Sequence, residues 1–101
     1  MKLRVLKEAE LEIESARVWL NRRASDLGSR FLEDLSATFA AIQDRPQSFS
    51  RLETMPDNWP YRRALLRTFR YAVIFEELDD EILIVAVAHA GREPNYWLDR
   101  T

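Results

Sequence analysis

Arginine supplies nearly all of the positive charge in this chain, with thirteen arginines and two lysines among 101 residues. The guanidinium group donates two parallel hydrogen bonds to a carboxylate or a phosphate, so clustered arginines suit an anionic partner. Arg62 and Arg63 are adjacent in a strand-like run and would point to opposite faces, whereas Arg63 and Arg67 share a face. Arg63 and Arg67 are therefore candidates for binding a partner. Ion pairing with Glu76 or Glu77 on a neighbouring strand is the structural alternative.

The single histidine, His89, ends an apolar run. A lone histidine in that position is more often a hydrogen-bonded structural residue than a proton-transfer group. The chain has no cysteine, which excludes disulfides, thiolate metal ligands and a cysteine nucleophile. Asp79 and Asp80 are expected to form a turn, because no further carboxylates lie close to them in sequence. The sequence predicts no metal site and no cofactor.

The formal charge of −2 weighs against a protein that grips nucleic acid through many phosphates, because such proteins usually carry a basic excess. No signal peptide is visible at Met1. The longest apolar run, Ile82–Ala88, is much shorter than the roughly 20 residues that span a bilayer. We expect one soluble cytoplasmic domain over residues 1–101, with no membrane partner.

Two helices are predicted in the first half of the chain. Leu3 and Val5 alternate with charged residues and indicate a short opening strand. The helix that follows has apolar residues at spacings of four, three and four, with Trp19 expected in the core: Ala9, Ile13, Ala16 and Leu20. The second helix, about 28–43, carries one apolar stripe: Phe31, Leu35, Phe39 and Ile42. A short linker at Gly28 favours an antiparallel helical hairpin.

Three strands are predicted in the second half, at 61–67, 71–76 and 82–89. They follow an irregular loop from Pro46 to Pro60, which Phe49 and Leu52 would anchor. Short connections imply antiparallel pairing, and the third strand is apolar on both faces, as a central strand would be. Gly91 is expected to need unusual backbone angles, and 94–100 to form a short C-terminal helical turn. The fold class is α+β, in the order β-α-α-β-β-β, with the helical hairpin packed on a mainly antiparallel sheet.

Several ordered segments sharpen this prediction: Leu27–Phe31, Ile42–Phe49, Tyr61–Leu66, Phe69–Phe75, Ile84–Arg92 and Pro94–Trp97. Taken together, and with Trp19 midway along the first helix, they resemble the RelE/ParE toxin superfamily, whose members are often called plasmid stabilisation proteins. The resemblance covers essentially the whole chain. It implies the toxin of a type II toxin–antitoxin system, neutralised by a cognate antitoxin.

RelE-like members of this superfamily cut messenger RNA on the ribosome. That reaction needs a base for the 2′-hydroxyl proton, cations against the phosphate and an acid for the leaving oxygen. The resemblance implies that these roles would fall to a set of residues near the ends of the late strands: Arg70, His89, Arg92 and Tyr96. The nuclease branch commonly has arginine where this chain has Ala72. Arg70 lies two residues away, on the same face of a regular strand, and would substitute only in part.

The ParE-like branch inhibits DNA gyrase by binding it and requires no hydrolytic residues. The alanine at position 72 and the lack of a basic excess favour this branch. The alternative is a ribosome-dependent mRNA endonuclease, which would make the chain an enzyme. An inactivated toxin that survives only as an antitoxin partner is a third reading.

The resemblance also implies how the antitoxin binds. In this superfamily an extended or helical C-terminal segment of the antitoxin typically wraps over the helices and sheet of the toxin. The arginine-rich strand at 61–67 and the amphipathic helices would accept an acidic, amphipathic peptide that folds on contact. Arg63 and Arg67 are the candidates for this contact or for the target, and a toxin–antitoxin heterotetramer is one assembly that the resemblance allows.

Overall fold

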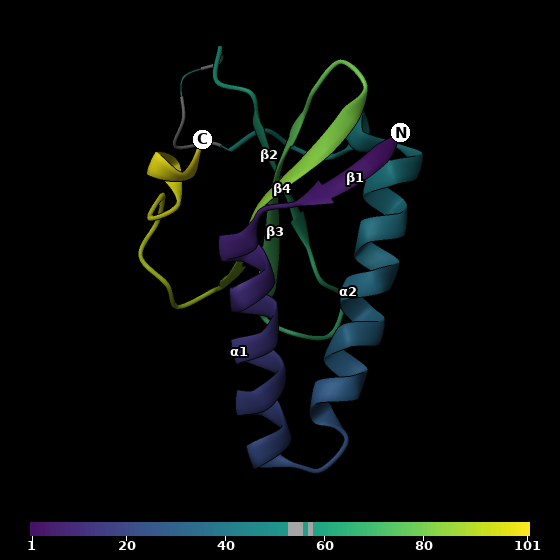
Figure 1. Ribbon diagram of the computed structural model, residues 1–101, viewed down its shortest axis with the longest axis vertical. Coiled ribbons are helices and arrows are strands. Elements are labelled where there is room, and N and C mark those ends of the chain that lie inside the picture. Colours follow the sequence, from purple (N-terminus) through teal and green to yellow (C-terminus); the bar gives the residue numbers. More distant parts are fainter. Residues whose placement is uncertain (53–55, 57) are drawn as a thin grey trace.

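The computed structural model describes residues 1–52, 56 and 58–101. Its order of elements confirms the α+β prediction, with two helices between the first strand and the other three (Figure 1). The elements are β1 Lys2–Val5, α1 Lys7–Arg23, α2 Leu27–Asp44, β2 Tyr61–Leu65, β3 Tyr71–Glu77 and β4 Glu81–His89. Short 3-10 helices lie at Pro46–Ser48 and Leu98–Arg100, and the second is the predicted C-terminal helical turn.

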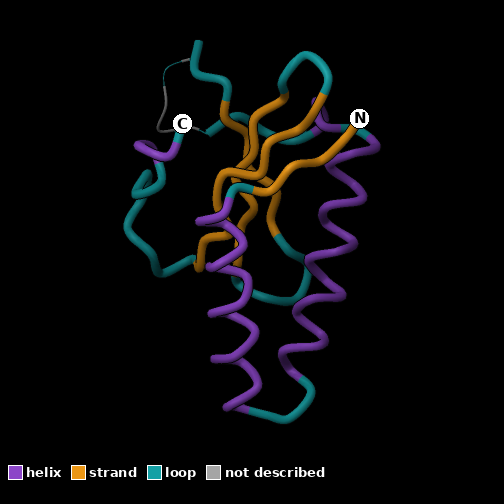
Figure 2. The backbone as a smooth tube through the Cα atoms, in the orientation of Figure 1, coloured by secondary structure: helices purple, strands orange, loops and turns teal. Residues whose placement is uncertain are grey.

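The four strands form one sheet in the order β1-β4-β3-β2. Figure 2 shows the strands, in orange, lying together beside the helices. β2 pairs antiparallel with β3, and β3 pairs antiparallel with β4. β1 pairs parallel with β4, and it covers only the first part of that strand, Glu81–Ile84. The sheet is therefore mainly antiparallel, as predicted. On the side of β4 that faces β1, the residues after Ile84 have no strand neighbour among the described residues.

The helical hairpin covers one face of the sheet, and its far end extends beyond the strands (Figure 1). The main core lies between these two layers and contains the predicted stripe of α2 together with one face of the sheet: Phe31, Leu35, Ile42, Val73, Phe75, Ile82 and Ile84. A second cluster lies on the opposite face and includes Tyr61, Ile74, Leu83, Val85 and Trp97. β4 contributes to both clusters, which confirms that it is a central strand covered on both faces.

A bulge in β4 changes which side chains face the helices. Ile74 of β3 pairs with Ala86, and Phe75 pairs with Ile84, so Val85 has no direct partner. Val85 and Ala86 consequently both face the second cluster, whereas Val87 returns to the main core. The bulge thus interrupts the two-residue period that the sequence suggests.

Two predictions from individual residues were wrong. Trp19 is not in the core: 47% of it is exposed, and Arg23 lies over its ring at 4.2 Å. Gly91 does not have a positive φ; the positive value of 63° belongs to Asn95, a residue type that tolerates the left-handed region. Gly28 lies in the first turn of α2, directly after the hairpin connection, and its N–H donates to Asn21 Oδ1 at 2.8 Å.

The loop from Pro46 to Pro60 is anchored as predicted where the structure describes it. Phe49 packs against the main core, with its ring 5.9 Å from that of Phe75, and Leu52 packs against the second cluster. Residues 53–55 and 57 of this predicted loop lie outside the described residues. Within the described part of the chain, no helix is long and apolar enough to cross a membrane.

Candidate functional site

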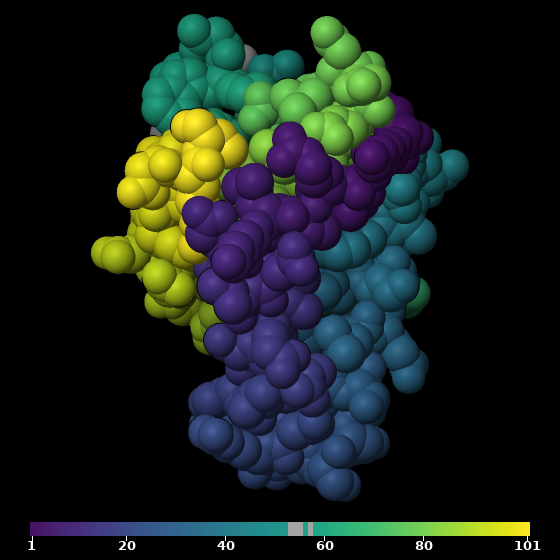
Figure 3. All heavy atoms as spheres, viewed as in Figure 1, coloured from purple at the N-terminus to yellow at the C-terminus, as the bar shows by residue number. Residues whose placement is uncertain are grey.

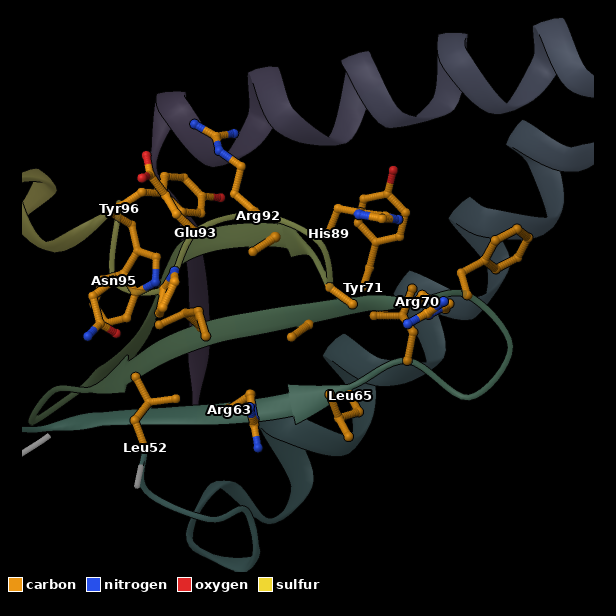
Figure 4. Close-up of a pocket in the computed structure, with 18 of the residues that line it drawn as sticks. Leu52, Arg63, Leu65, Arg70, Tyr71, His89, Arg92, Glu93, Asn95 and Tyr96 are labelled. Atoms are coloured by element: carbon orange, nitrogen blue, oxygen red, sulfur yellow. The ribbon is translucent and has the colours of Figure 1, made fainter. Parts of the chain in front are cut away.

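A hollow of about 610 Å³ lies on the face of the sheet that the helices leave open. Its floor crosses three strands, because Leu65 of β2 pairs with Ala72 of β3, which in turn pairs with Ala88 of β4. Directly paired residues point to the same face of a sheet, so these three side chains form one row. The side chains of the two alanines are short, so the middle of this row does not protrude into the hollow. Leu65 is 66% exposed beside them and forms an apolar edge (Figure 4).

Four arginines line the hollow. Arg63 comes from β2, Arg67 and Arg70 come from the loop between β2 and β3, and Arg92 follows β4. All four are exposed, and within the described part of the chain no carboxylate pairs with any of them. We call this feature the arginine hollow.

Arg63 and Arg67 both line the arginine hollow, but they do not share a strand face as predicted. β2 ends at Leu65, two residues before the predicted end, so Arg67 lies in the following loop and not on a strand face. Arg62 points to the other face, as alternation requires, and its Nη1 donates to the carbonyl of Phe49 at 2.6 Å. No ion pair joins Arg63 to Glu76 or Glu77.

The residues that an RNA-cleaving site would use, Arg70, His89, Arg92 and Tyr96, all line the arginine hollow. Tyr96 is nevertheless turned toward α1, where its hydroxyl donates a hydrogen bond to Glu12 (Figure 4). Arg92 stacks over the ring of Tyr96 at 3.9 Å. Burial of Tyr96, followed by its hydrogen bond to Glu12, raises the pKa of the hydroxyl well above its usual value. A tyrosine held in this way is a poor base at neutral pH.

His89 lies at the end of β4, with its ring 5.1 Å from that of Tyr71. Its Nδ1 accepts a hydrogen bond from the N–H of Gly91 at 3.0 Å. Tyr71, the residue in contact with His89, is partly buried, and this burial raises the pKa of its hydroxyl. His89 thus accepts a hydrogen bond from its own turn, and its exposed side chain also lines the hollow.

Two carboxylates that support the site were missed from the sequence. Glu12 in α1 holds Tyr96, and Asp34 in α2 accepts hydrogen bonds from the loop that carries Arg67. Asp34 lies three residues after Phe31, at the margin of the apolar stripe of α2. A charged residue beside an apolar stripe was a feature of the sequence that could have identified Asp34 as a candidate.

The arginine hollow is suited to binding anionic groups that adjoin apolar ones. In the described part of the chain, no group of three or more His, Cys, Asp or Glu residues could hold a metal ion. The guanidinium groups offer paired donors for carboxylates or phosphates, and the floor offers apolar surface. This combination matches an acidic protein segment that carries large apolar side chains.

Comparison with known proteins gives two matches. The family model described as "ParE toxin of type II toxin-antitoxin system, parDE" matches residues 3–94. A solved chain described as "Chromosomal ParDE TA system from P. aeruginosa" has the same fold, with a TM-score of 0.75 and 15% sequence identity. The match covers 88% of this chain and 95% of that one. No curated protein sequence matches.

Proposed function

The chain belongs to the ParE toxin family of type II toxin–antitoxin systems, and we propose that it arrests growth by binding a target through the arginine hollow. DNA gyrase is the proposed target. The cognate antitoxin, the partner that a type II system implies, would neutralise the toxin by covering the same hollow. A heterotetramer of the two proteins is the proposed assembly of the neutral state.

The arginine hollow is the observation that carries this proposal. Its four arginines have no carboxylate partner among the described residues, and they surround an apolar floor. Exposed apolar surface next to unpaired cations is typical of a protein-binding site. The net charge of −2 means that the chain has no overall basic excess, which favours an acidic protein segment over an extended nucleic-acid backbone.

Two features argue against the alternative of an mRNA endonuclease. Ala72 occupies the middle of the floor, and the resemblance implies that the nuclease branch commonly has arginine at this position. The hydroxyl of Tyr96 donates a hydrogen bond to Glu12 and has a raised pKa. It therefore stays protonated at neutral pH and cannot take the proton of a 2′-hydroxyl. A binding toxin needs neither group.

Charge reversal inside and outside the arginine hollow tests the proposal. Arg63→Glu with Arg67→Glu reverses two charges at the hollow, and Arg22→Glu with Arg30→Glu reverses two exposed charges at the end of the helical hairpin. Each variant is induced alone in bacteria, and the purified proteins are tested for binding to DNA gyrase. The hollow variant should bind roughly tenfold more weakly and lose growth arrest, whereas the hairpin variant should keep both.

Tyr96→Phe separates binding from RNA cleavage. The substitution removes the hydroxyl and keeps the ring under Arg92. We expect growth arrest to persist, with DNA-damage signalling and with protein synthesis intact in the first minutes. An early collapse of protein synthesis in cells that make the wild-type chain, abolished by Tyr96→Phe, would establish the nuclease instead.

A further inference from the structure

Asp34 holds the loop that carries two of the four hollow arginines. The loop runs from Leu66 to Arg70, between β2 and β3. Three consecutive backbone N–H groups of this loop donate to the carboxylate of Asp34: those of Arg67 at 3.2 Å, Thr68 at 2.8 Å and Phe69 at 3.3 Å. A single side chain of α2 therefore fixes the middle of the loop.

Apolar contacts hold the same loop from both ends. Leu66 is buried in the main core, and the ring of Phe69 packs edge-on against Phe31 at 5.7 Å. Phe31 and Asp34 are three residues apart on α2 and thus lie on one face of the helix. Because these contacts direct the apolar side chains inward, Arg67 and Arg70 remain exposed at the rim of the arginine hollow.

We propose that Asp34 is a positioning residue, which sets the orientation of Arg67 and Arg70 for the anionic partner of the hollow. The proposal rests on the proposed function. A loop without this anchor would lose conformational freedom on binding, and that loss weakens affinity. Hydrogen bonds from successive N–H groups to one carboxylate remove this freedom in advance.

The sign of the effect separates positioning from simple electrostatics. Asp34 adds a negative charge close to arginines that would bind an acidic partner. If Asp34 acted only through its charge, its neutralisation would strengthen binding. Positioning requires the opposite, because the arginines become less ordered when the anchor is weakened. Glu33→Gln is the matched control, since Glu33 is the exposed neighbour of Asp34 on the same turn.

The experiment measures the affinity of four variants for the DNA gyrase holoenzyme by surface plasmon resonance. They are Asp34→Asn, Glu33→Gln, the double variant Arg67→Ala with Arg70→Ala, and the triple variant that combines this pair with Asp34→Asn. We expect Asp34→Asn to bind about tenfold more weakly and Glu33→Gln to bind as the wild type does or slightly better. In the background that lacks both arginines, Asp34→Asn should have little further effect, because the residues it positions are gone.

Amide hydrogen exchange provides a readout that does not depend on the target. The N–H of Thr68 should exchange roughly tenfold faster in Asp34→Asn, with circular dichroism and the exchange of β4 unchanged. An unchanged exchange rate at Thr68 would contradict the claim that Asp34 holds this loop. Affinity equal to that of Glu33→Gln, or an equal loss in the background without the arginines, would overturn the positioning role.

Failure of the proposed function has a different signature. If the wild type does not bind gyrase, the proposed target is wrong, and the same variants are then ranked by growth arrest after induction. If the double arginine variant is fully active in that assay, the hollow is not the site of action. The inference about Asp34 then fails with it.

Discussion

Glu12 in α1 and Arg100 near the C-terminus form an ion pair at 2.9 Å, with only 14% of each side chain exposed. A second nitrogen of Arg100 lies 3.1 Å from the other carboxylate oxygen, so the pair is bidentate. The hydrogen bond with Glu12 raises the pKa of Arg100. Figure 3 shows the C-terminal segment lying against the start of α1.

The pair also completes the edge of β4 where β1 ends. Glu12 accepts a hydrogen bond from the N–H of Val87 at 3.0 Å, and Arg100 donates to the carbonyl of Val85 at 3.1 Å. Unpaired groups on a strand edge invite pairing with another chain. Glu12 and Arg100 satisfy two of these groups and fix the C-terminal segment, which includes Tyr96, beside the arginine hollow.

Loss of the Glu12 carboxylate should destabilise the fold strongly. Glu12→Ala leaves Arg100 without its partner at a largely buried site, and we expect the free energy of unfolding to fall by about 3 kcal/mol. Urea denaturation followed by circular dichroism measures this change. Glu14→Ala is the control, because it breaks the exposed pair between Glu14 and Arg17 and should have almost no effect. Equal losses in the two variants would contradict the structural role of Glu12.

Tyr96 should make stability depend on pH in the alkaline range. Its pKa is raised in the folded protein, so folding favours the protonated hydroxyl. The contribution is complete below the unfolded tyrosine pKa of about 10 and is lost as the pH rises above it. At pH 8, Tyr96→Phe should cost about 1–2 kcal/mol through the missing hydrogen bond to Glu12.

Urea denaturation at several pH values between 8 and 11 checks this dependence. The difference in stability between the wild type and Tyr96→Phe should shrink as the pH rises. Tyr71 also has a raised pKa, but it is present in both proteins and cancels in the comparison. A difference that stays constant across the range would mean that the Tyr96 hydroxyl has an ordinary pKa.

Gly28→Ala should destabilise the helical hairpin. A Cβ at Gly28 would lie 2.7 Å from the carbonyl oxygen of Arg17 and 2.5 Å from Asn21 Oδ1, so the two helices would have to separate. We expect a loss of about 2 kcal/mol, measured by thermal unfolding. Gly91→Ala is the matched control, because its Cβ would meet only the exposed ring of His89, at 3.2 Å. Comparable melting temperatures for the two variants would contradict the close approach of the helices.

Trp19 and Trp97, two of the three tryptophans, should respond differently to truncation. Trp97 is 3% exposed and packs against Tyr61 at 4.8 Å, so Trp97→Ala should cost about 3–5 kcal/mol. Trp19→Ala removes an exposed ring and should change stability much less. Thermal unfolding of both variants gives the comparison. A large loss for Trp19→Ala would place that ring in the core after all.

The apolar periodicity of the sequence predicted most of the fold. The stripe from Phe31 to Ile42 predicted α2 and its buried face, and the apolar run Ile82–Ala88 predicted a central strand. These predictions succeeded because apolar side chains must be buried, and their spacing determines which element can bury them. The same argument failed for Trp19, since size and hydrophobicity do not reveal whether another layer lies above a residue.

The candidate site was predicted in part. Arg63, Arg67, Arg70 and Arg92 were chosen from their positions and from the resemblance, and the structure brings them together around one hollow. The supporting residues Asp34 and Glu12 were not predicted. Each acts on segments far away in the sequence, and the position of a charge on a helix does not reveal which distant segment it contacts.

The sequence by itself determined the order of the elements, the buried faces and an arginine-rich chain without cysteine. Only the tertiary structure decided where the arginines point. The early end of β2, the bulge at Val85 and the carboxylate of Asp34 set the orientation of side chains around the hollow. The reason is physical: local periodicity follows from the backbone of one segment, whereas the site depends on hydrogen bonds between segments that meet only after folding.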